Sequence, residues 1–429
     1  MNFSSLGLDP NILKALDACG YTQMTPVQEM AIIPARRGKD VLANAQTGTG
    51  KTAAFALPIL QQMLDKPQET KGCYPRALIL TPTRELAEQL ANTIGAYAQF
   101  LPFTVMAAFG GVKMGGQERK LKAGVDILIA TPGRLIEHLT QCNVNLANTN
   151  FLVLDEADRM LDMGFIDDVQ TVFQQTSKER QTLLFSATMS RAVNELSHKI
   201  LKNHEEIRVD KQNITADTIE HVVYPVEERR KIDLFLKLLE QYNWFQVLVF
   251  TSTKEQADRL MASLKREKVD AAVCHADKSQ GARRRALADF KDNKIQVLIA
   301  TEVAARGLDI EGLEYVVNYN LPYLAEDYVH RIGRTGRAGN EGVAISFVSR
   351  EEERALDSIE RLIGGRIQRI VKRGFEVTSR DSLIKTVSRS SKPGRTNKVS
   401  SARGAAGANQ GKKVAARVSK AKRPKAKKK

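Results

Sequence analysis

The stretch at residues 45–52 constrains this chain more than any other, because it joins two segments of different pattern. Residues 41–43 are apolar and typical of a buried strand, whereas residues 53–63 have the spacing of a helix. A strand, a glycine-rich turn, Gly-Lys-Thr and a helix in that order predict a phosphate-binding loop. Its glycines let backbone N–H groups surround a phosphate, and the helix N-terminus adds the positive end of its dipole.

Two side chains of this loop have expected roles in binding a nucleotide. Lys51 would reach the β- and γ-phosphates, and the Thr52 hydroxyl would complete the coordination shell of Mg²⁺. The loop departs from the general pattern at Ala45, where a glycine is usual, so an ordinary turn between a strand and a helix remains an alternative at this point. The residues assigned to the loop are Ala45, Gln46, Thr47, Gly48, Thr49, Gly50, Lys51 and Thr52.

Short apolar runs alternate with helical stretches through the first half of the chain. The apolar runs are residues 77–80, 125–129, 151–154 and 182–185. This alternation indicates an α/β fold with a parallel sheet covered by helices on both faces. Ligands of such sheets bind beyond the carboxyl ends of the strands. Polar residues follow each run at that end: Pro82, Thr83 and Arg84; Thr131, Pro132, Gly133 and Arg134; Asp155 and Glu156; Ser186 and Thr188.

Asp155 and Glu156 form an acidic pair at the end of one of these runs. Asp155 is suited to hold Mg²⁺ through water. Glu156 is placed to orient and deprotonate an attacking water molecule. The alternative, two acids that stabilise the N-terminus of the next helix, loses weight because a phosphate-binding loop lies upstream.

The second half of the chain repeats the alternation without a phosphate-binding loop of its own. Its apolar runs are residues 246–250, 271–274, 295–299, 315–317 and 342–348, and the polar residues 210–217 before them predict a linker. The glycine-rich stretch 330–337 contains Arg334 and Arg337, which could serve as arginine fingers for a γ-phosphate. The alternative is a pair of solvated surface arginines.

Length, apolar runs and cysteines exclude several classes of protein. At 429 residues the chain is too long for one core. It has no run of about 18 apolar residues, so we expect no membrane span, and we see no export signal at the N-terminus. The four cysteines are far apart and form no C-x-x-C pair, which fits a reducing cytosol.

The positive charge gathers at the end of the chain. Residues 366–429 hold 21 Lys and Arg against two acids, a net +19, so residues 1–365 carry −3 of the total of +16. Such an asymmetry predicts an electrostatic arm for a polyanion, and a solubilising tail is the alternative. We expect the arm to be mostly disordered, because it has almost no large apolar residue beyond Arg389. Residues 366–385 differ, because Ile367, Ile370, Val371 and Phe375 could pack on the second domain.

Together these residues resemble a DEAD-box RNA helicase over about residues 1–365, and the general pattern resembles the bacterial RhlE-type group. The resemblance rests on Phe3 with residues 20–28, and on residues 45–52, 82–86, 110–111, 131–134, 155–158, 186–188, 249–252, 280–283, 301–309 and 330–337. Ala45 is usual in this family. Glu302 departs from it, since an Asp is usual there.

The resemblance implies two tandem RecA-like domains and an ATP site in the cleft between them. The implied boundaries are 1–208 for the first domain, 209–219 for a hinge, 220–365 for the second domain and 366–429 for the basic extension. ATP and Mg²⁺ would be the cofactors. The implied nucleotide-binding residues beyond the loop are Phe3, Tyr21, Gln28, Asp309, Arg334 and Arg337. Gln28 would read the adenine edge with its amide, Phe3 would stack on the ring, and Asp309 would contact the ribose.

The resemblance also implies that RNA lies across both domains and is held by its phosphates and 2′-hydroxyls. The implied RNA-binding residues are Pro82, Thr83, Arg84, Gly110, Gly111, Thr131, Pro132, Gly133, Arg134, Arg283 and Thr301. Ser186, Thr188 and His330 would couple ATP hydrolysis to RNA binding.

The expected function is ATP-dependent unwinding of short RNA duplexes, in ribosome assembly or RNA turnover in the cytoplasm. Ribosomal precursor particles and RNA-processing proteins are the expected partners. The alternatives are an RNA clamp or annealing protein that uses ATP only to lock onto RNA, and a DNA helicase of the same superfamily. The complete set of nucleotide-site residues argues against the clamp, and the residues on the RNA side argue against DNA.

Overall fold

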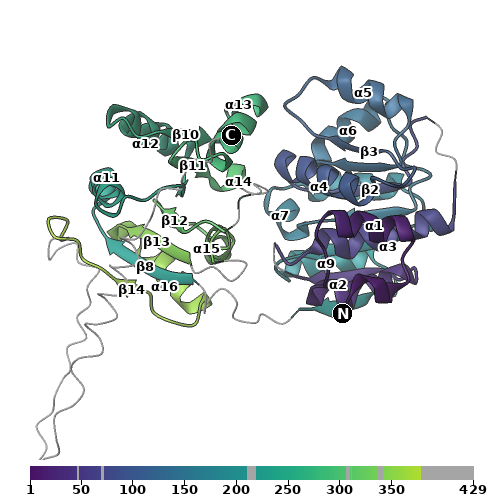
Figure 1. Cartoon of the computed structure of the whole chain (residues 1–429), viewed down its shortest axis with the longest axis horizontal. Helices are drawn as coiled ribbons and strands as arrows, with labels where there is room; N and C mark the ends of the chain where they lie inside the picture. The colour runs from purple at the N-terminus through teal and green to yellow at the C-terminus, as the bar shows by residue number, and fades with distance from the viewer. Residues whose placement is uncertain are drawn as a thin grey trace, which may run out of the picture. The chain divides into compact units, whose positions relative to one another are not determined.

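The computed structural model describes residues 1–45, 48–68, 72–209, 219–305, 310, 312–336 and 342–377. These residues form two compact units, one within residues 1–209 and the other within residues 219–377. Each unit contains a seven-stranded sheet with helices on both faces (Figure 1). The α/β class predicted from the alternating runs is therefore confirmed for both halves.

Several residues of the sequence-based predictions lie outside the described residues. They are Gln46 and Thr47 of the loop, Asp309, Arg337, residues 210–218 of the expected hinge and residues 378–429 of the basic extension.

The first sheet is parallel throughout, with the strand order β3-β4-β2-β5-β6-β1-β7. Its strands are β1 (Val41–Asn44), β2 (Ala77–Leu80), β3 (Val105–Ala108), β4 (Ile127–Ala130), β5 (Phe151–Leu154), β6 (Gln181–Ser186) and β7 (Glu205–Arg208). Because all the strands are parallel, the segments that follow β1, β2, β4, β5 and β6 start from one edge of the sheet.

The helices of the first unit connect these strands. They are η1 (Phe3–Leu6), α1 (Pro10–Ala18), α2 (Pro26–Arg36), α3 (Lys51–Asp65), α4 (Arg84–Tyr97), α5 (Met114–Ala123), α6 (Pro132–Thr140), α7 (Ala157–Asp162), α8 (Ile166–Gln175) and α9 (Arg191–Ile200). Local sequence signals explain several of their starts. The Thr83 hydroxyl accepts a hydrogen bond from Leu86 N at the start of α4, and Pro132 occupies the first position of α6, where its missing N–H costs nothing.

The second sheet is also parallel and has the order β10-β11-β9-β12-β13-β8-β14. Its strands are β8 (Ile219–Pro225), β9 (Val247–Thr251), β10 (Ala271–Cys274), β11 (Val297–Thr301), β12 (Tyr315–Asn318), β13 (Gly342–Val348) and β14 (Gln368–Arg369). Its helices are η2 (Glu228–Arg230), α11 (Lys231–Tyr242), α12 (Lys254–Arg266), α13 (Gln280–Lys291), α14 (Glu302–Ala305), α15 (Ala325–Ile332), η3 (Arg350–Glu352) and α16 (Glu353–Leu362).

Apolar side chains on both faces of each sheet hold the layers together. On β1, Val41 and Ala43 join one core, whereas Leu42 between them joins the core on the opposite face. On the second sheet, Val249 and Val223 likewise belong to cores on different faces. Burial of each such Val or Leu contributes roughly 1.5–3 kcal/mol. Strands buried on both faces explain why the sequence shows continuous apolar runs.

The second unit continues beyond the boundary expected at residue 365. Strand β14 pairs in parallel with β8 at the sheet edge (Figure 1). Ile367 and Phe375 are buried in the cores of the unit. The Glu360 carboxylate accepts a hydrogen bond from Ile367 N at 2.9 Å and pairs with Arg369 at 3.0 Å. The first twelve residues of the basic extension are therefore part of the folded unit.

Candidate functional site

The phosphate-binding loop lies between β1 and α3, as the sequence predicts. Gly48 and Gly50 have φ angles of 80° and 87°, in the left-handed region that glycine adopts most readily. A Cβ atom on Gly50 would lie 2.3 Å from Gln28 Nε2, so the close approach of Gln28 also requires a glycine. Helix α3 begins at Lys51, directly after the loop, and Thr52 is its second residue. The helix N-terminus therefore faces the loop with its unpaired N–H groups.

Lys51 and Asp155 face each other at the carboxyl edge of the first sheet. Both side chains are buried, and the Lys51 ammonium lies 3.8 Å from the Asp155 carboxylate. Among the described residues, Lys51 Nζ has no hydrogen-bond partner, which is costly for a buried cation. Burial raises the pKa of Asp155 above its ordinary value, and the charge of Lys51 opposes this effect. An unsatisfied ammonium beside a glycine loop fits a phosphate ligand.

Glu156 follows Asp155 in a backbone conformation that is rare for its residue type. Its φ angle is 56°, and it caps the N-terminus of α7. Its N–H donates to Asp155 Oδ1 at 3.1 Å, and only 7% of the residue is exposed. A non-glycine residue in the left-handed region costs about 1–3 kcal/mol, and such residues cluster at functional sites. The turn holds the two carboxylates in a fixed relation at the end of β5.

The predicted coupling residues Ser186 and Thr188 lie next to the acidic pair. Ser186 Oγ donates to the Thr188 carbonyl at 2.7 Å. Both the N–H and the hydroxyl of Thr188 donate to Asp158 Oδ2 at 2.9 Å. The segment after β6 is thus tied to α7, the helix that Glu156 caps. Movement of the segment after β6 would therefore act on the helix that directly follows the acidic pair.

Gln28 connects helix α2 to the phosphate-binding loop. Its Oε1 accepts from Thr25 N at 2.8 Å, and its Nε2 donates to the Gly50 carbonyl at 3.0 Å. The amide is 5% exposed. A primary amide has two donor hydrogens and two acceptor lone pairs, so one of each remains for a ligand. This remaining pair matches the donor and acceptor on an adenine edge.

The two aromatic residues expected at the nucleotide differ in exposure. Phe3 is 4% exposed and belongs to the core of the first unit. Tyr21 is 40% exposed, and its hydroxyl lies 3.5 Å from that of Tyr97. The ring of Phe3 is therefore enclosed by the core in this structure, whereas the ring of Tyr21 is accessible to solvent.

The residues expected to bind RNA in the first unit gather around one loop. The Arg84 guanidinium lies so close to Gly111 that a Cβ on this glycine would be 1.9 Å from Arg84 Nη1. Arg134 donates from Nη1 and Nη2 to the Val112 carbonyl at 3.2 Å and pairs with Glu137 at 3.0 Å. The structure thus brings together Arg84, Gly110, Gly111 and Arg134. Arg134 is 8% exposed, and its contacts show that it positions the loop.

A buried polar group supports the same loop from inside the unit. Gln117 Nε2 donates to the Phe109 carbonyl at 3.0 Å, and Gln117 Oε1 lies 3.0 Å from His138 Nε2. Burial, together with the nearby Arg134 charge, lowers the pKa of His138. His138 is therefore neutral at pH 7 and can act as a hydrogen-bond partner without a charge.

In the second unit the predicted residues lie at the ends of β11 and α15 and on α13. Thr301 ends β11, Arg283 lies near the N-terminus of α13, and His330 lies in the last turn of α15. Arg283 and Arg334 are 7% and 9% exposed. The structure places each of these residues within its unit, and their roles in binding stay predictions.

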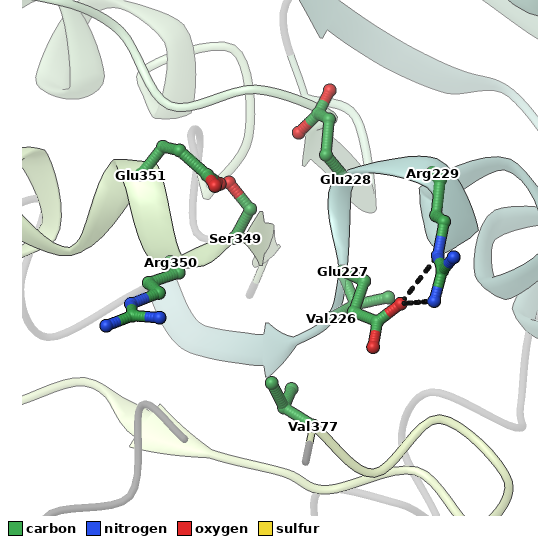
Figure 2. Close-up of a pocket in the computed structure, with 8 residues that line it drawn as sticks. All are labelled: Val226, Glu227, Glu228, Arg229, Ser349, Arg350, Glu351 and Val377. Atoms are coloured by element: carbon green, nitrogen blue, oxygen red, sulfur yellow. Dashed lines mark hydrogen bonds and ion pairs between the residues drawn. The ribbon is translucent and has the colours of Figure 1, made fainter. Parts of the chain in front are cut away.

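A separate pocket lies where β8 and β13 end, with a volume of about 350 Å³. Figure 2 shows its lining side chains, with Arg229 directed at Glu227 at 2.8 Å. Its lining residues are Val226, Glu227, Glu228, Arg229, Ser349, Arg350, Glu351 and Val377. None of the residues expected to bind nucleotide or RNA lines it.

Comparisons with known proteins agree with this arrangement. Residues 25–196 match the family described as DEAD/DEAH box helicase, and residues 230–339 match the family described as helicase conserved C-terminal domain. The ATP-dependent RNA helicase CshA of Listeria monocytogenes is 42% identical over 366 residues, which are 85% of this chain and 69% of CshA. This chain belongs to the DEAD-box helicase family.

Other relatives and solved structures extend the comparison. The ATP-dependent RNA helicase RhlB of Pseudomonas syringae is 40% identical, with 85% of this chain and 93% of RhlB covered. The structure of S. cerevisiae Dbp5 bound to RNA and ADP BeF3 has a TM-score of 0.76 and 32% identity, and covers 86% of this chain and 95% of Dbp5. The two tandem RecA-like domains implied by the sequence are thus confirmed. The RhlE-type subgroup stays a prediction.

The sequence-based analysis missed two structural partners of the DEAD-box motifs. Asp158, the last residue of the Asp-Glu-Ala-Asp motif, holds Thr188. Arg331 is 2% exposed, and its Nε lies 2.5 Å from the carboxylate of Glu302, the residue that departs from the usual Asp. The position of Arg331 in the 330–337 stretch was a signal for a role, but its partner lies 29 residues earlier.

We expect Gly111→Ala to weaken RNA binding by this DEAD-box protein more than Gly110→Ala does. A Cβ on Gly111 would collide with Arg84 at 1.9 Å, and φ at this residue is 78°, so both the guanidinium and the backbone must shift. A Cβ on Gly110 would lie 3.5 Å from Arg84, an ordinary contact. RNA affinity measured for both variants tests this, with the unfolding midpoint as the control for folding. Equal affinities would show that the position of Arg84 does not matter for RNA.

Proposed function

We infer that this chain is an ATP-dependent RNA helicase, an RNA-dependent ATPase that converts ATP and water to ADP and phosphate. The observation that carries this inference is the buried set of Lys51, Asp155 and Glu156 at one edge of the first sheet. Its chemistry is that of nucleotide hydrolysis. Relatives named as ATP-dependent RNA helicases, and Dbp5 solved with RNA and ADP BeF3, support ATP and RNA as the ligands.

The residues of the first unit would divide the chemical step between them. Lys51 would neutralise charge on the β- and γ-phosphates, which its buried ammonium beside Asp155 favours. Glu156 would orient the attacking water and accept its proton. Thr188 and Asp158 would report the state of the nucleotide site to the segment after β6, because their two hydrogen bonds join α7 to that segment.

Mg²⁺ is the metal that fits this site. It usually binds through one or two carboxylates together with phosphate oxygens and waters. Asp155 is a buried carboxylate beside the loop, and Thr52 is the hydroxyl residue that follows Lys51. Within the described ranges no three His, Cys, Asp or Glu side chains gather to form a metal site of their own. Thr52 and Asp155 would therefore hold Mg²⁺, which supplies positive charge at the phosphates.

The second unit would complete the site and extend the RNA surface. Arg334 and Arg337 are the proposed arginine fingers, and Asp309 is the proposed ribose contact. Arg283 and Thr301 are proposed to contact RNA, and His330 to couple the two ligands. The domain limits at 208 and 220, with a hinge between them, belong to the same proposal.

RNA would be held through its backbone. Arg84 and the Gly110–Gly111 turn offer a cation and backbone N–H groups, which suit phosphate oxygens and carry no sequence information. We propose remodelling of structured RNA in ribosome assembly or RNA turnover, in the cytoplasm. No helix in the described part of the chain is long and apolar enough to cross a membrane.

A strand-displacement assay tests this proposal. Short RNA and DNA duplexes should be compared with ATP, with ADP and without nucleotide. An RNA helicase should separate the RNA duplex only with ATP. ATP-dependent RNA binding without displacement would instead support a clamp or annealing protein, and equal displacement of both duplexes would contradict the choice of RNA.

We expect hydrolysis of ATP to be favoured over GTP, and Gln28→Ala to reduce this preference. Guanine presents the reverse of the donor and acceptor pattern of adenine, so it does not match the donor and acceptor that remain on Gln28. The mismatch would leave polar groups unpaired, at a cost of roughly 1–3 kcal/mol. Rates of RNA-stimulated hydrolysis with each nucleotide measure the preference. Gln23→Ala is the matched control, because Gln23 lies in the same segment but is exposed. A preference unchanged in Gln28→Ala would show that another residue reads the base.

A further inference from the structure

The folded start of the basic extension forms a cationic surface with α11. We call Arg230, Lys237, Lys372 and Arg373 the extension patch. Arg230 is the N-cap of α11, and Lys237 lies seven residues later on the same face of the helix. Seven residues are two helical turns, so the two residues are separated by about 10 Å along the helix axis. Lys372 and Arg373 follow β14, the strand that brings the extension to the sheet edge. The patch therefore exists only because residues 366–377 pack on the second unit.

Two aromatic rings contact three of the four cations of the patch: Arg230, Lys237 and Lys372. The Arg230 guanidinium lies over the Phe375 ring at 4.4 Å, and Lys237 Nζ lies 5.5 Å from the same ring. Lys372 Nζ lies 5.1 Å from the Tyr242 ring and donates to Gln241 Oε1. Arg230 also donates to the Gly374 carbonyl at 2.6 Å. Cation–π contacts place these charges at the surface without neutralising them.

Among the described residues no carboxylate forms an ion pair with the patch, although the Glu376 carboxylate lies near Arg230 and Arg373. Within residues 219–305, 312–336 and 342–377, none of its four cations has an ion pair. Neighbouring Arg229 is different, because it pairs with Glu227 at 2.8 Å (Figure 2). The nearest acid in sequence is Glu376, whose carboxylate accepts hydrogen bonds from Gly374 N at 2.9 Å. Asp233 and Glu240 also lie on α11, without an ion pair to the patch.

The charges of the patch lie close enough to influence one another and the neighbouring acid Glu376. Burial lowers the pKa of Lys372, and repulsion by Lys237 lowers it further. The pKa of Glu376 is also lowered, because backbone N–H groups bond its carboxylate and because Arg230 and Arg373 lie near it. Cations that repel one another are stabilised by an anion that binds them together.

We propose that the extension patch binds the sugar-phosphate backbone of RNA, at a place separate from the residues of the family motifs. The inference rests on the proposed function only in taking RNA as the polyanion. Residues 378–429, which follow the patch directly, carry 17 Lys and Arg and one acid. RNA bound at the patch could therefore also contact the Lys and Arg residues that follow the patch in the sequence. Phosphates are contacted in this way without reading sequence.

The test compares two double variants of the full chain. Lys237→Gln/Lys372→Gln removes two charges from the patch. The matched control, Lys199→Gln/Lys265→Gln, removes two exposed lysines of α9 and α12. Affinity for a single-stranded RNA is measured at several salt concentrations. The slope of log K against log salt should be smaller by about 0.7 for each lost contact. Between 1 M and 0.1 M salt, two such contacts would increase RNA affinity by up to about 25-fold, and the double variant of the patch should lose this increase.

A second measurement locates the RNA directly. A photo-crosslinking residue in place of exposed Arg373 should attach to bound RNA, whereas the same residue in place of Lys265 should not. Basal ATP hydrolysis should be unchanged in all these variants. Equal slopes for the two double variants would overturn the proposal. If Lys237→Gln/Lys372→Gln lost binding of poly-glutamate but not of RNA, the patch would be assigned to an acidic protein segment. If the wild-type chain itself bound no RNA, the proposed function would fail as well.

Discussion

ATP hydrolysis should fall by roughly 10²–10⁴-fold in the Glu156→Gln variant, the range expected when a positioned general base is lost. The amide keeps the size of the side chain but cannot accept the proton of the attacking water. Nucleotide binding should persist, because Lys51 and the glycine loop are untouched. Lys51→Ala should abolish hydrolysis too, but with weaker nucleotide binding, since the buried ammonium is the cation closest to the loop.

Hydrolysis and binding must be measured separately to distinguish the two roles. Steady-state phosphate release gives the rate, and titration with a fluorescent ATP analogue gives the affinity. Glu179→Gln and Lys66→Ala are suitable controls, because both residues are exposed and belong to the same unit. Hydrolysis at the wild-type rate by Glu156→Gln would show that another group handles the water.

Most of the strands that the sequence revealed lie in the middle of the sheets. The runs at 77–80, 151–154 and 342–348 coincide with the central strands β2, β5 and β13, whereas the run at 271–274 coincides with β10 at a sheet edge. Strands in the middle of a parallel sheet are buried on both faces, so their sequences are continuously apolar. The first domain could be recognised for a second reason, because its glycine loop is a motif that joins a strand to a helix.

The strands that the sequence did not reveal lie mostly at the sheet edges. Strand β7 reads Glu-Glu-Ile-Arg and buries only Ile207, and β14 has two residues. Strand β3 is the opposite edge of the first sheet and is half-buried at Val105 and Ala107. Strand β8 is buried, but polar residues just before it made its start resemble a linker. Solvent covers part of an edge strand, so its sequence need not be continuously apolar.

The partners of the site residues could not be predicted from local patterns. Thr188 meets Asp158 from 30 residues away, and Gln28 meets Gly50 from 22 residues away. Motifs identify the chemistry that each residue can perform. Only the order of the strands decides which of these residues meet, because β5, β6 and β1 are neighbours in the sheet but far apart in sequence.

Arg331→Met should destabilise the second unit by about 3–5 kcal/mol, the cost of removing one partner of a buried ion pair. Arg331 is 2% exposed and pairs with Glu302 at 2.5 Å. It also donates to Asn318 Oδ1 at 3.2 Å and to the Asn320 carbonyl at 2.7 Å. Its guanidinium lies 5.0 Å from the Phe250 ring. Loss of the guanidinium would remove the donor that serves the Glu302 carboxylate, Asn318 Oδ1 and the Asn320 carbonyl.

Denaturant unfolding of the full chain measures this cost, with the transition of each unit followed separately. Arg354→Met is the control, because Arg354 is exposed on α16 of the same unit and should change the free energy of unfolding by less than about 0.5 kcal/mol. The double variant Glu302→Met/Arg331→Met should be more stable than Arg331→Met alone, since the partly buried carboxylate that has lost Arg331 is then also removed. If removing the carboxylate restored nothing, the cost would come from the asparagine contacts, and the longer side chain of Glu302 would have no structural role.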